Sequence, residues 1–303
     1  MELSIGNVHE ITKFYNISGI KDLARLHSGY ANTNFCLRTN SGDYLLKIFE
    51  EKSIEDIHHE IAVLNYLREE KYPAAFPVAR SDGKYITKSL YGNVVLYDFI
   101  DGNDGPINPR TVAVIARTVA KLHLLEGWRS FDKENSLSIG LCERTISRFS
   151  SSKNKYPEIF DFFREETDFL TYPLLEKLPR GLIHGDIFPD NSIWSGDRLL
   201  AIVDFEEICT DHLLFDVGVT INGFCFVDNR LNHELKDIFI KEYNSKRKME
   251  PRELELLPYY IQWGAHVMIC WHLKHLLDFY DSRKMARLSF FMERVQKLRK
   301  KFQ

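Results

Sequence analysis

LIHGDIFPDNSIW, residues 182–194, is the stretch that decides the fold. It places His184, Asp186 and Asn191 within an otherwise apolar run, and core strands rarely contain such side chains. Thirteen residues after Asn191, a second apolar run ends at Asp204 in the segment AIVDFEE. The joint spacing of these four residues indicates a loop that carries chemistry.

These side chains match the needs of phosphoryl transfer from ATP, which depends on positioning and on neutralising phosphate charge. Asp186 is predicted to orient the acceptor hydroxyl and accept its proton, as the catalytic residue. Asn191 and Asp204 supply hard oxygen ligands and are predicted to bind Mg²⁺. His184 is predicted to organise the loop by hydrogen bonding, and Asp216, twelve residues after Asp204, to tie the loop down.

The chain before residue 101 is predicted to form a small, strand-rich lobe. FCLRT and DYLLKIF flank NSG, a hairpin pattern, and from Ser53 apolar residues recur at helical spacing. DGNDGPINP, at 101–109, is the best linker candidate. The sequence therefore predicts an N-terminal nucleotide-binding lobe, residues 1–100, and a mainly helical catalytic and acceptor-binding lobe, residues 101–303. This is a two-lobe α+β fold, with the active site expected in the cleft.

The first lobe has to supply contacts to the nucleotide. Lys47 lies in a strand-like run and Glu60 follows thirteen residues later on the predicted helix, and kinases use such a pair to hold phosphates. HSGYANTNF, at 27–35, is predicted to cover the phosphates, and VVLYDFIDG to hold adenine through its extended backbone. The candidate nucleotide-binding residues are Lys47, Glu60, Asn32, Asn34, Asp98 and Ile100.

Composition narrows the class of protein. With 303 residues and a net charge of −3, the chain lacks the basic face of a nucleic-acid binder. Its N-terminus shows no signal-peptide pattern, and YYIQWGAHVMICWHL, at 259–273, is predicted to be a buried helix instead of a membrane span. The five scattered Cys predict free thiols in a reducing compartment, hence a cytoplasmic protein. The oligomeric state is left open.

From about Gly29 onward, these motifs resemble the aminoglycoside phosphotransferase and choline kinase superfamily, which shares the protein-kinase fold. Gly185 stands where the kinase motif has Arg, and Glu206 stands at the third position of Asp-Phe-Gly, as is usual in this superfamily. GLIHGDIFPDNSIW and AIVDFEEICTDHLLFDVGVTINGFCF further resemble the kinase-like family of bacterial homoserine kinases. The sequence departs from that family at two places. Members of the family often have a residue other than lysine at the position of Lys47, and they more often have DFYF where this sequence has DFEE.

The resemblance implies an ATP- and Mg²⁺-dependent kinase for the hydroxyl of a small molecule, with L-homoserine as the expected acceptor and O-phosphohomoserine as the product. Another small alcohol (an aminoglycoside, choline or another amino alcohol), a non-catalytic pseudokinase and a protein kinase are the alternatives. The short segment between Asp204 and Asp216 favours a small acceptor over a peptide. Candidates for binding an ammonium group of the acceptor are Glu206, Asn222 and Asp228.

Overall fold

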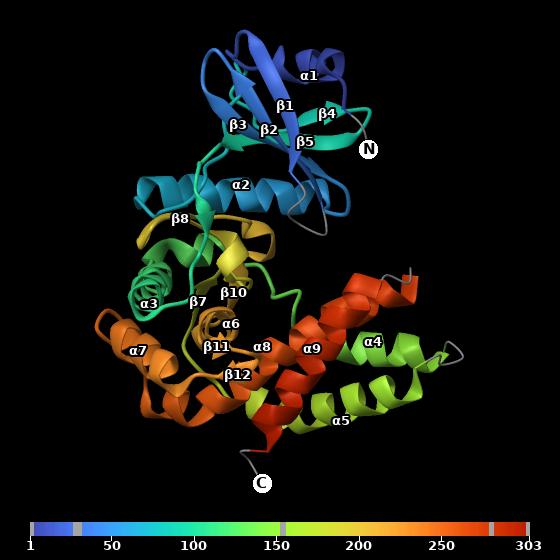
Figure 1. Ribbon diagram of the computed structural model, residues 1–303, viewed down its shortest axis with the longest axis vertical. Helices are drawn as coiled ribbons and strands as arrows, with labels where there is room; N and C mark the ends of the chain where they lie inside the picture. Colours follow the sequence, from blue (N-terminus) through green and yellow to red (C-terminus); the bar gives the residue numbers. More distant parts are fainter. Residues whose placement is uncertain (1–2, 27–31, 152–155, 279–281, 301–303) are drawn as a thin grey trace. The chain divides into compact units, whose positions relative to one another are not determined.

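The computed structural model describes residues 3–26, 32–151, 156–278 and 282–300 (Figure 1). The helices in these ranges are α1 (Ile5–Thr12), α2 (Ile54–Glu69), α3 (Pro109–His123), α4 (Ile139–Ser151), α5 (Pro157–Leu174), α6 (Leu213–Phe224), α7 (His233–Asn244), α8 (Pro251–Asp278) and α9 (Ser282–Arg299). Short 3₁₀ helices are η1 (Glu126–Phe131), η2 (Pro189–Asn191) and η3 (Phe205–Glu207). The secondary structure confirms the predicted α+β class.

The strands of the described chain are short and mostly antiparallel. They are β1 (Ile20–Leu26), β2 (Asn32–Thr39), β3 (Asp43–Phe49), β4 (Thr87–Ser89), β5 (Gly92–Asp98), β6 (Asn103–Asp104), β7 (Arg180–Ile183), β8 (Ser192–Ser195), β9 (Arg198–Ile202), β10 (Cys209–His212), β11 (Phe226–Val227) and β12 (Arg230–Leu231). They form a sheet of order β1-β2-β3-β5-β4, a sheet of order β6-β8-β9 and the pairs β7–β10 and β11–β12.

The chain divides into two compact units that do not follow the sequence order throughout. Unit 1 contains Met1–Asn103, Ile193–Ser195 and Leu200–Glu206, and unit 2 contains Asp104–Ser192, Gly196–Leu199 and Glu207–Gln303. Asp204 and Glu206 therefore belong to unit 1, together with the strand-rich part of the chain.

In unit 1, the predicted hairpin is formed by β2 and β3, whose register places Asn34 opposite Lys47. Gly42 closes its turn with a φ of 134°, a conformation that favours glycine. Helix α2 starts where predicted, because the side chain of Ser53 accepts a hydrogen bond from the backbone N–H of Asp56. Helix α1 covers the five-stranded sheet, and its Val8 packs in the sheet's core.

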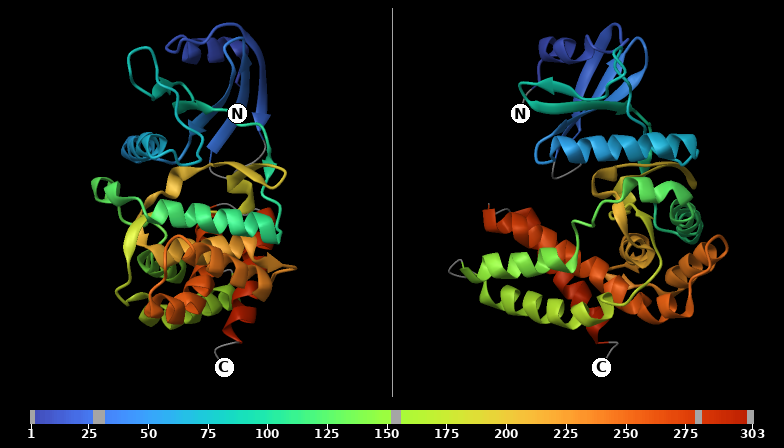
Figure 2. Two further views of the ribbon diagram at one scale, coloured as in Figure 1. Left: turned by 90° about the vertical axis from the view of Figure 1, so that its left-hand side faces the viewer. Right: turned by 180° about the vertical axis from the view of Figure 1, so that it is seen from behind.

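In unit 2, helix α8 packs against α4, α5, α6 and α9, whereas α7 packs against α3 (Figure 2). The apolar stretch predicted to form a buried helix lies within α8. Among the described helices, none combines the length and apolar character needed to span a lipid bilayer. Helices α6 and α8 approach so closely at Gly218 that a Cβ atom there would lie 2.3 Å from the carbonyl oxygen of Tyr260.

Replacing Gly218 by Ala should therefore destabilise unit 2. The added methyl group would meet backbone atoms of α8, which cannot move aside as a flexible side chain can. We expect the free energy of unfolding to fall by at least about 2 kcal/mol. Urea denaturation measures the change, with Gly140→Ala as the control, because its Cβ would meet only side-chain atoms, of Arg144 at 3.3 Å and of Ser138 at 3.6 Å. Equal stability of the two variants would contradict the close packing of α6 on α8.

Candidate active site

The loop at residues 184–191, here called the HGD loop, begins directly after β7 and is anchored by one carboxylate. Asp216, in the first turn of α6, accepts hydrogen bonds from the backbone N–H groups of His184 (2.9 Å) and Gly185 (2.7 Å). Both His184 and Asp216 are fully buried. Gly185 has a φ of 83°, which favours glycine at this turn. The carboxylate thus fixes the backbone that leads into Asp186.

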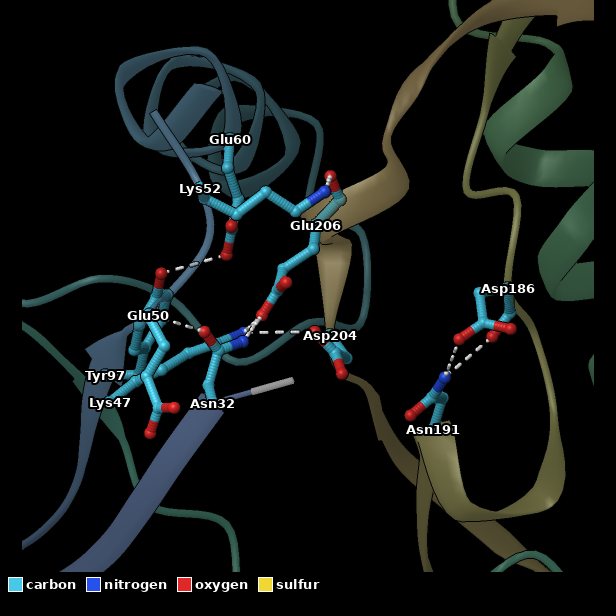
Figure 3. A network of polar contacts seen from close by, with 10 residues as sticks. All are labelled: Asn32, Lys47, Glu50, Lys52, Glu60, Tyr97, Asp186, Asn191, Asp204 and Glu206. Carbon is cyan, nitrogen blue, oxygen red and sulfur yellow. Dashed lines mark hydrogen bonds and ion pairs between the residues drawn. The ribbon is translucent and has the colours of Figure 1, made fainter. Parts of the chain in front are cut away.

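Asp186 and Asn191 face each other across the HGD loop (Figure 3). The amide nitrogen of Asn191 donates to a carboxylate oxygen and to the backbone oxygen of Asp186, both at 2.8 Å. Its amide oxygen points away from Asp186. The Nδ1 atom of His184 accepts the backbone N–H of Asp186 at 3.2 Å, so His184 shapes the loop through hydrogen bonds.

A series of buried polar side chains is connected to Asp216 by hydrogen bonds. The Nε2 atom of His123 lies 3.2 Å from its carboxylate, and the Nδ1 atom of His123 lies 2.7 Å from the hydroxyl of Tyr243. Tyr243 in turn accepts from Arg247, which forms an ion pair with Glu253. No local pattern in the sequence indicates these contacts, because the residues are far apart along the chain: His123 ends α3, Tyr243 lies in α7, Arg247 lies between α7 and α8, and Glu253 lies in α8.

The pKa shifts in this hydrogen-bonded series favour a charged Asp216 beside a neutral His123. Burial lowers the pKa of His123 and outweighs the effect of the neighbouring carboxylate. Burial opposes ionisation of Asp216, but hydrogen bonds, first from His123 and then from the backbone of His184, hold its pKa below the usual value. A neutral His123 that donates from Nε2 and accepts at Nδ1 satisfies both partners.

In unit 1, four side chains form the Lys47 cluster: Asn32, Lys47, Asp204 and Glu206 (Figure 3). The Nζ atom of Lys47 forms ion pairs with Asp204, at 3.0 Å, and with Glu206. Asn32 donates its amide N–H to Glu206, and Lys52 donates to the backbone oxygen of Glu206 at 3.1 Å. The side chain of Asp204 is 43% exposed, whereas that of Glu206 is buried.

Charge in the Lys47 cluster is concentrated and poorly solvated. Burial by itself would lower the pKa of Lys47, but the carboxylates of Asp204, Glu60 and Glu206 raise it above its ordinary value. Burial raises the pKa of Glu206 to about 7, although Lys47 opposes this shift. Asp204 adopts a φ of 62°, a strained conformation that proteins tend to retain at functional sites.

The structure shows a different partner for Lys47 from the expected Glu60. Glu60 is buried in α2, and its carboxylate accepts a hydrogen bond from the hydroxyl of Tyr97 at 2.9 Å. Burial raises the pKa of Glu60, and the attraction of Lys47 lowers it only in part. Lys47 instead pairs with the two acids that follow β9, because Glu206 reaches it from the third position of the Asp-Phe-Glu motif. Sequence spacing could not distinguish these partners.

The other candidate nucleotide ligands lie on or just after strands of unit 1. Asn34 lies on β2, and its amide oxygen is buried without a hydrogen-bond partner in the described chain. Asp98 ends β5, and its backbone N–H donates to the carbonyl of Phe76 at 2.9 Å. Ile100 follows this strand and is partly buried. The predicted phosphate-covering segment lies, for residues 27–31, outside the described residues.

The three candidate acceptor ligands belong to different units, Glu206 to unit 1 and Asn222 and Asp228 to unit 2. Glu206 lies in the Lys47 cluster of unit 1. Asn222 is 2% exposed, and its amide nitrogen donates to the carbonyl of Ile261 at 2.6 Å, so it joins α6 to α8. Asp228 is exposed in the turn between β11 and β12, with a φ of 48°. Of these residues, Asn222 has contacts that identify a structural role.

The predicted metal ligands have the right donor chemistry for Mg²⁺. The turned-out amide oxygen of Asn191 and the exposed carboxylate of Asp204 are hard oxygen ligands. In the described ranges, no group of three or more His, Cys, Asp or Glu residues could hold a metal ion by itself.

Comparison with known proteins assigns the family. Residues 22–251 match the model of the phosphotransferase enzyme family, so the chain belongs to that family. A homoserine kinase from Nitrobacter winogradskyi is 27% identical over 306 aligned residues, which cover 96% of this chain and 90% of the relative. A homoserine kinase from a Bradyrhizobium strain is 26% identical over 98% of this chain and 93% of its own length.

Solved structures agree on the fold. A microcompartment-associated aminopropanol kinase superposes with a TM-score of 0.79 at 15% identity, over 99% of this chain and 98% of its own. A spectinomycin phosphotransferase, solved with ADP and spectinomycin, gives 0.74 at 15% identity over 98% of both chains. The predicted protein-kinase-like fold is thereby confirmed. As a member of this family, the protein is a phosphotransferase that acts on a hydroxyl group of a small molecule.

Replacing Asp216 by Asn should loosen the HGD loop, because one carboxylate accepts from two backbone amides and from His123. We expect unfolding free energy at pH 7 to fall by about 2–4 kcal/mol. Since the pKa of Asp216 lies below its unfolded value of about 3.9, its contribution is present above that pH and is lost as the pH falls further. Thermal melts between pH 3 and 7 should therefore show a shallower acid limb in the variant.

Asp197→Asn is the control for this experiment, because Asp197 pairs with Arg110 at the surface. Its acid limb should match that of the wild type. An Asp216→Asn protein with wild-type stability and the wild-type acid limb would show that the HGD loop does not depend on this carboxylate.

Proposed function

We propose that the protein transfers the γ-phosphoryl group of Mg²⁺-ATP to the hydroxyl of L-homoserine, giving O-phosphohomoserine and ADP. The observation that carries the proposal is the full-length similarity to relatives named homoserine kinase, which extends over 96% of this chain. The geometry of the HGD loop supports the reaction, because Asp186 and Asn191 are held in fixed mutual orientation. Binding of ADP by a fold neighbour supports a nucleotide as phosphoryl donor.

In this reaction the residues of the HGD loop act on the acceptor. The acceptor oxygen attacks the γ-phosphorus, its proton passes to the carboxylate of Asp186, and the bond from phosphorus to the ADP oxygen breaks. Asn191 holds the carboxylate of Asp186 in place through its amide N–H groups. Lys47 supplies positive charge for the phosphates of ATP, and Asn32 lies beside it. Bound Mg²⁺, held by Asn191 and Asp204, would neutralise phosphate charge.

Acceptors of other kinds are the competing proposals. An aminoglycoside carries several positive charges and needs a strongly acidic pocket. Two buried acids of unit 2 are already engaged, Asp216 by backbone amides and Glu253 by Arg247. A small amino acid with one hydroxyl therefore remains the best-supported acceptor.

The assay that tests the proposal measures ADP release by the purified protein with Mg²⁺-ATP. The panel of acceptors contains L-homoserine, other amino alcohols, choline and an aminoglycoside. Strong stimulation by L-homoserine alone supports the proposal. Stimulation by a different compound keeps the phosphotransferase and replaces the acceptor. ATP binding without transfer to any acceptor would indicate the non-catalytic alternative.

Asp186→Asn should lower kcat with L-homoserine by about 10²–10⁴-fold, because the amide cannot accept the hydroxyl proton. Asn and Asp have the same shape, so the melting temperature and the affinity for ATP should stay close to those of the wild type. Steady-state kinetics and a thermal-shift titration with ATP give both readouts. Asp197→Asn removes an exposed carboxylate of unit 2 and serves as the matched control. Substantial turnover by the Asp186→Asn protein would remove Asp186 from its proposed role.

A further inference from the structure

Arg294, on helix α9, is a buried cation that has no role in the reaction proposed above. It is only 5% exposed. Its Nη1 atom donates to the backbone oxygen of Asn222 at 2.7 Å and to the side-chain oxygen at 3.2 Å, and its Nε atom donates to the side-chain oxygen of Asn229 at 2.9 Å. All three acceptors are neutral. For the Nη2 atom, the described chain provides no hydrogen-bond acceptor.

The guanidinium of Arg294 also lacks a carboxylate partner in the described chain. This separates it from the three other partly buried arginines in the described part of unit 2. Arg117 pairs with Glu242 at 2.5 Å, Arg247 with Glu253 at 2.9 Å and Arg299 with Glu166 at 2.9 Å. Burial lowers the pKa of Arg294 to about 9, and the positive charge of Arg287 adds to this shift. The folded chain therefore carries a desolvated positive charge without a compensating anion.

Neighbouring groups compensate only part of this cost and keep the guanidinium in one orientation. Its carbon lies 4.0 Å from the ring centroid of Phe226, 5.0 Å from that of Phe290 and 5.4 Å from that of Phe291. Aromatic faces attract a cation, and the backbone oxygen of Asn222 lies near the C-terminal end of α6, where the helix dipole favours positive charge. These apolar walls also strengthen any ion pair formed beside them.

Arg294 is connected to the HGD loop through the end of α6. Asn222, which it contacts twice, is followed by Gly223. A Cβ atom on Gly223 would lie 3.0 Å from the backbone oxygen of Ile187 and 3.1 Å from the Cα atom of Phe188. Ile187 follows Asp186 directly in the sequence. The fixed cation therefore lies beside the end of α6, which packs against Ile187 and Phe188 of the HGD loop.

We propose that Arg294 binds a carboxylate group of the acceptor through its open guanidinium edge, and that the protein therefore selects hydroxylated acids over amino alcohols and aminoglycosides. This inference rests on the proposed transfer to a small hydroxyl compound. L-Homoserine has a carboxylate, whereas choline and aminoglycosides are cations that Arg294 would repel. A carboxylate bound to Arg294 would supply the anion that the folded chain lacks.

The test compares L-homoserine with 3-aminopropan-1-ol, which has hydrogen in place of the carboxylate. In the wild type, kcat/KM should favour L-homoserine by about 10- to 100-fold or more, as expected for a charge-assisted hydrogen bond. Arg294→Gln should abolish most of this preference by raising KM for L-homoserine, with little change for 3-aminopropan-1-ol. Thermal protection by 4-hydroxybutyrate, which keeps the carboxylate and the hydroxyl, should be present in the wild type and absent in the variant.

Lys297→Gln is the matched control, because Lys297 lies on the same helix and donates to the backbone oxygen of Asn229 at 3.3 Å. It should retain the wild-type preference. Arg294→Lys, which keeps a positive charge, should retain part of the preference and provides a folded variant if the Gln variant is unstable.

The outcomes separate this inference from the proposed function. If the wild type uses L-homoserine and Arg294→Gln keeps the preference for the carboxylate, Arg294 only joins α9 to α6 and the inference is wrong. Equal loss with both acceptors would also overturn it. If another hydroxylated acid is the acceptor and its selection depends on Arg294, the inference stands while L-homoserine is discarded. If only acceptors without a carboxylate are phosphorylated, the inference is wrong.

Discussion

The position of Asp186 depends on a buried carboxylate thirty residues further along the chain. Asp216 accepts the backbone amides of His184 and Gly185, and it can do so because α6 begins directly after β10, which pairs with β7. A charged acceptor in a dry environment binds amide donors strongly, and leaving those amides unpaired would be costly. The pairing is antiparallel, so Ile183, which leads into the HGD loop, lies opposite Cys209 at the start of β10. Helix α6 packs against β7, and the carboxylate of Asp216 fixes the loop that follows this strand.

The charge of Asp216 has to be compensated within the helical unit, and this explains the polar chain through its interior. His123, Tyr243 and Arg247 link the carboxylate to Glu253 by successive hydrogen bonds. Buried networks of this kind stabilise a single arrangement, because each member satisfies a neighbour. These hydrogen-bonded side chains therefore connect α3, α7 and α8 to the loop that carries Asp186.

Much of the fold could be predicted from the sequence, because its signals are local. Ser53 begins α2, NSG closes the β2–β3 hairpin, and the apolar stretch at 259–273 lies in α8. The HGD loop was equally recognisable, since Asp186 and Asn191 are five residues apart and contact each other. In each case the physical cause lies within a few residues of the effect.

The partners of charged residues could not be predicted in this way. The sequence spacing suggested a pair between Lys47 and Glu60. Instead, Lys47 forms an ion pair with Glu206, which is 159 positions later in the sequence, and Glu60 accepts a hydrogen bond from Tyr97. Such pairings depend on which carboxylate reaches the cation in three dimensions, and several acids lie at similar sequence distances.

The environment of Arg294 could not be predicted from the sequence either, because its contacts are with residues of α6 and of the β11–β12 turn, more than sixty positions earlier in the chain. Its significance comes from what surrounds it: three aromatic rings, neutral amide oxygens and no described acid. A cation buried in this way reduces stability unless an anion joins it. Because the family acts on small hydroxyl compounds, an acceptor that carries the missing anion would offset this cost and gain selectivity from it.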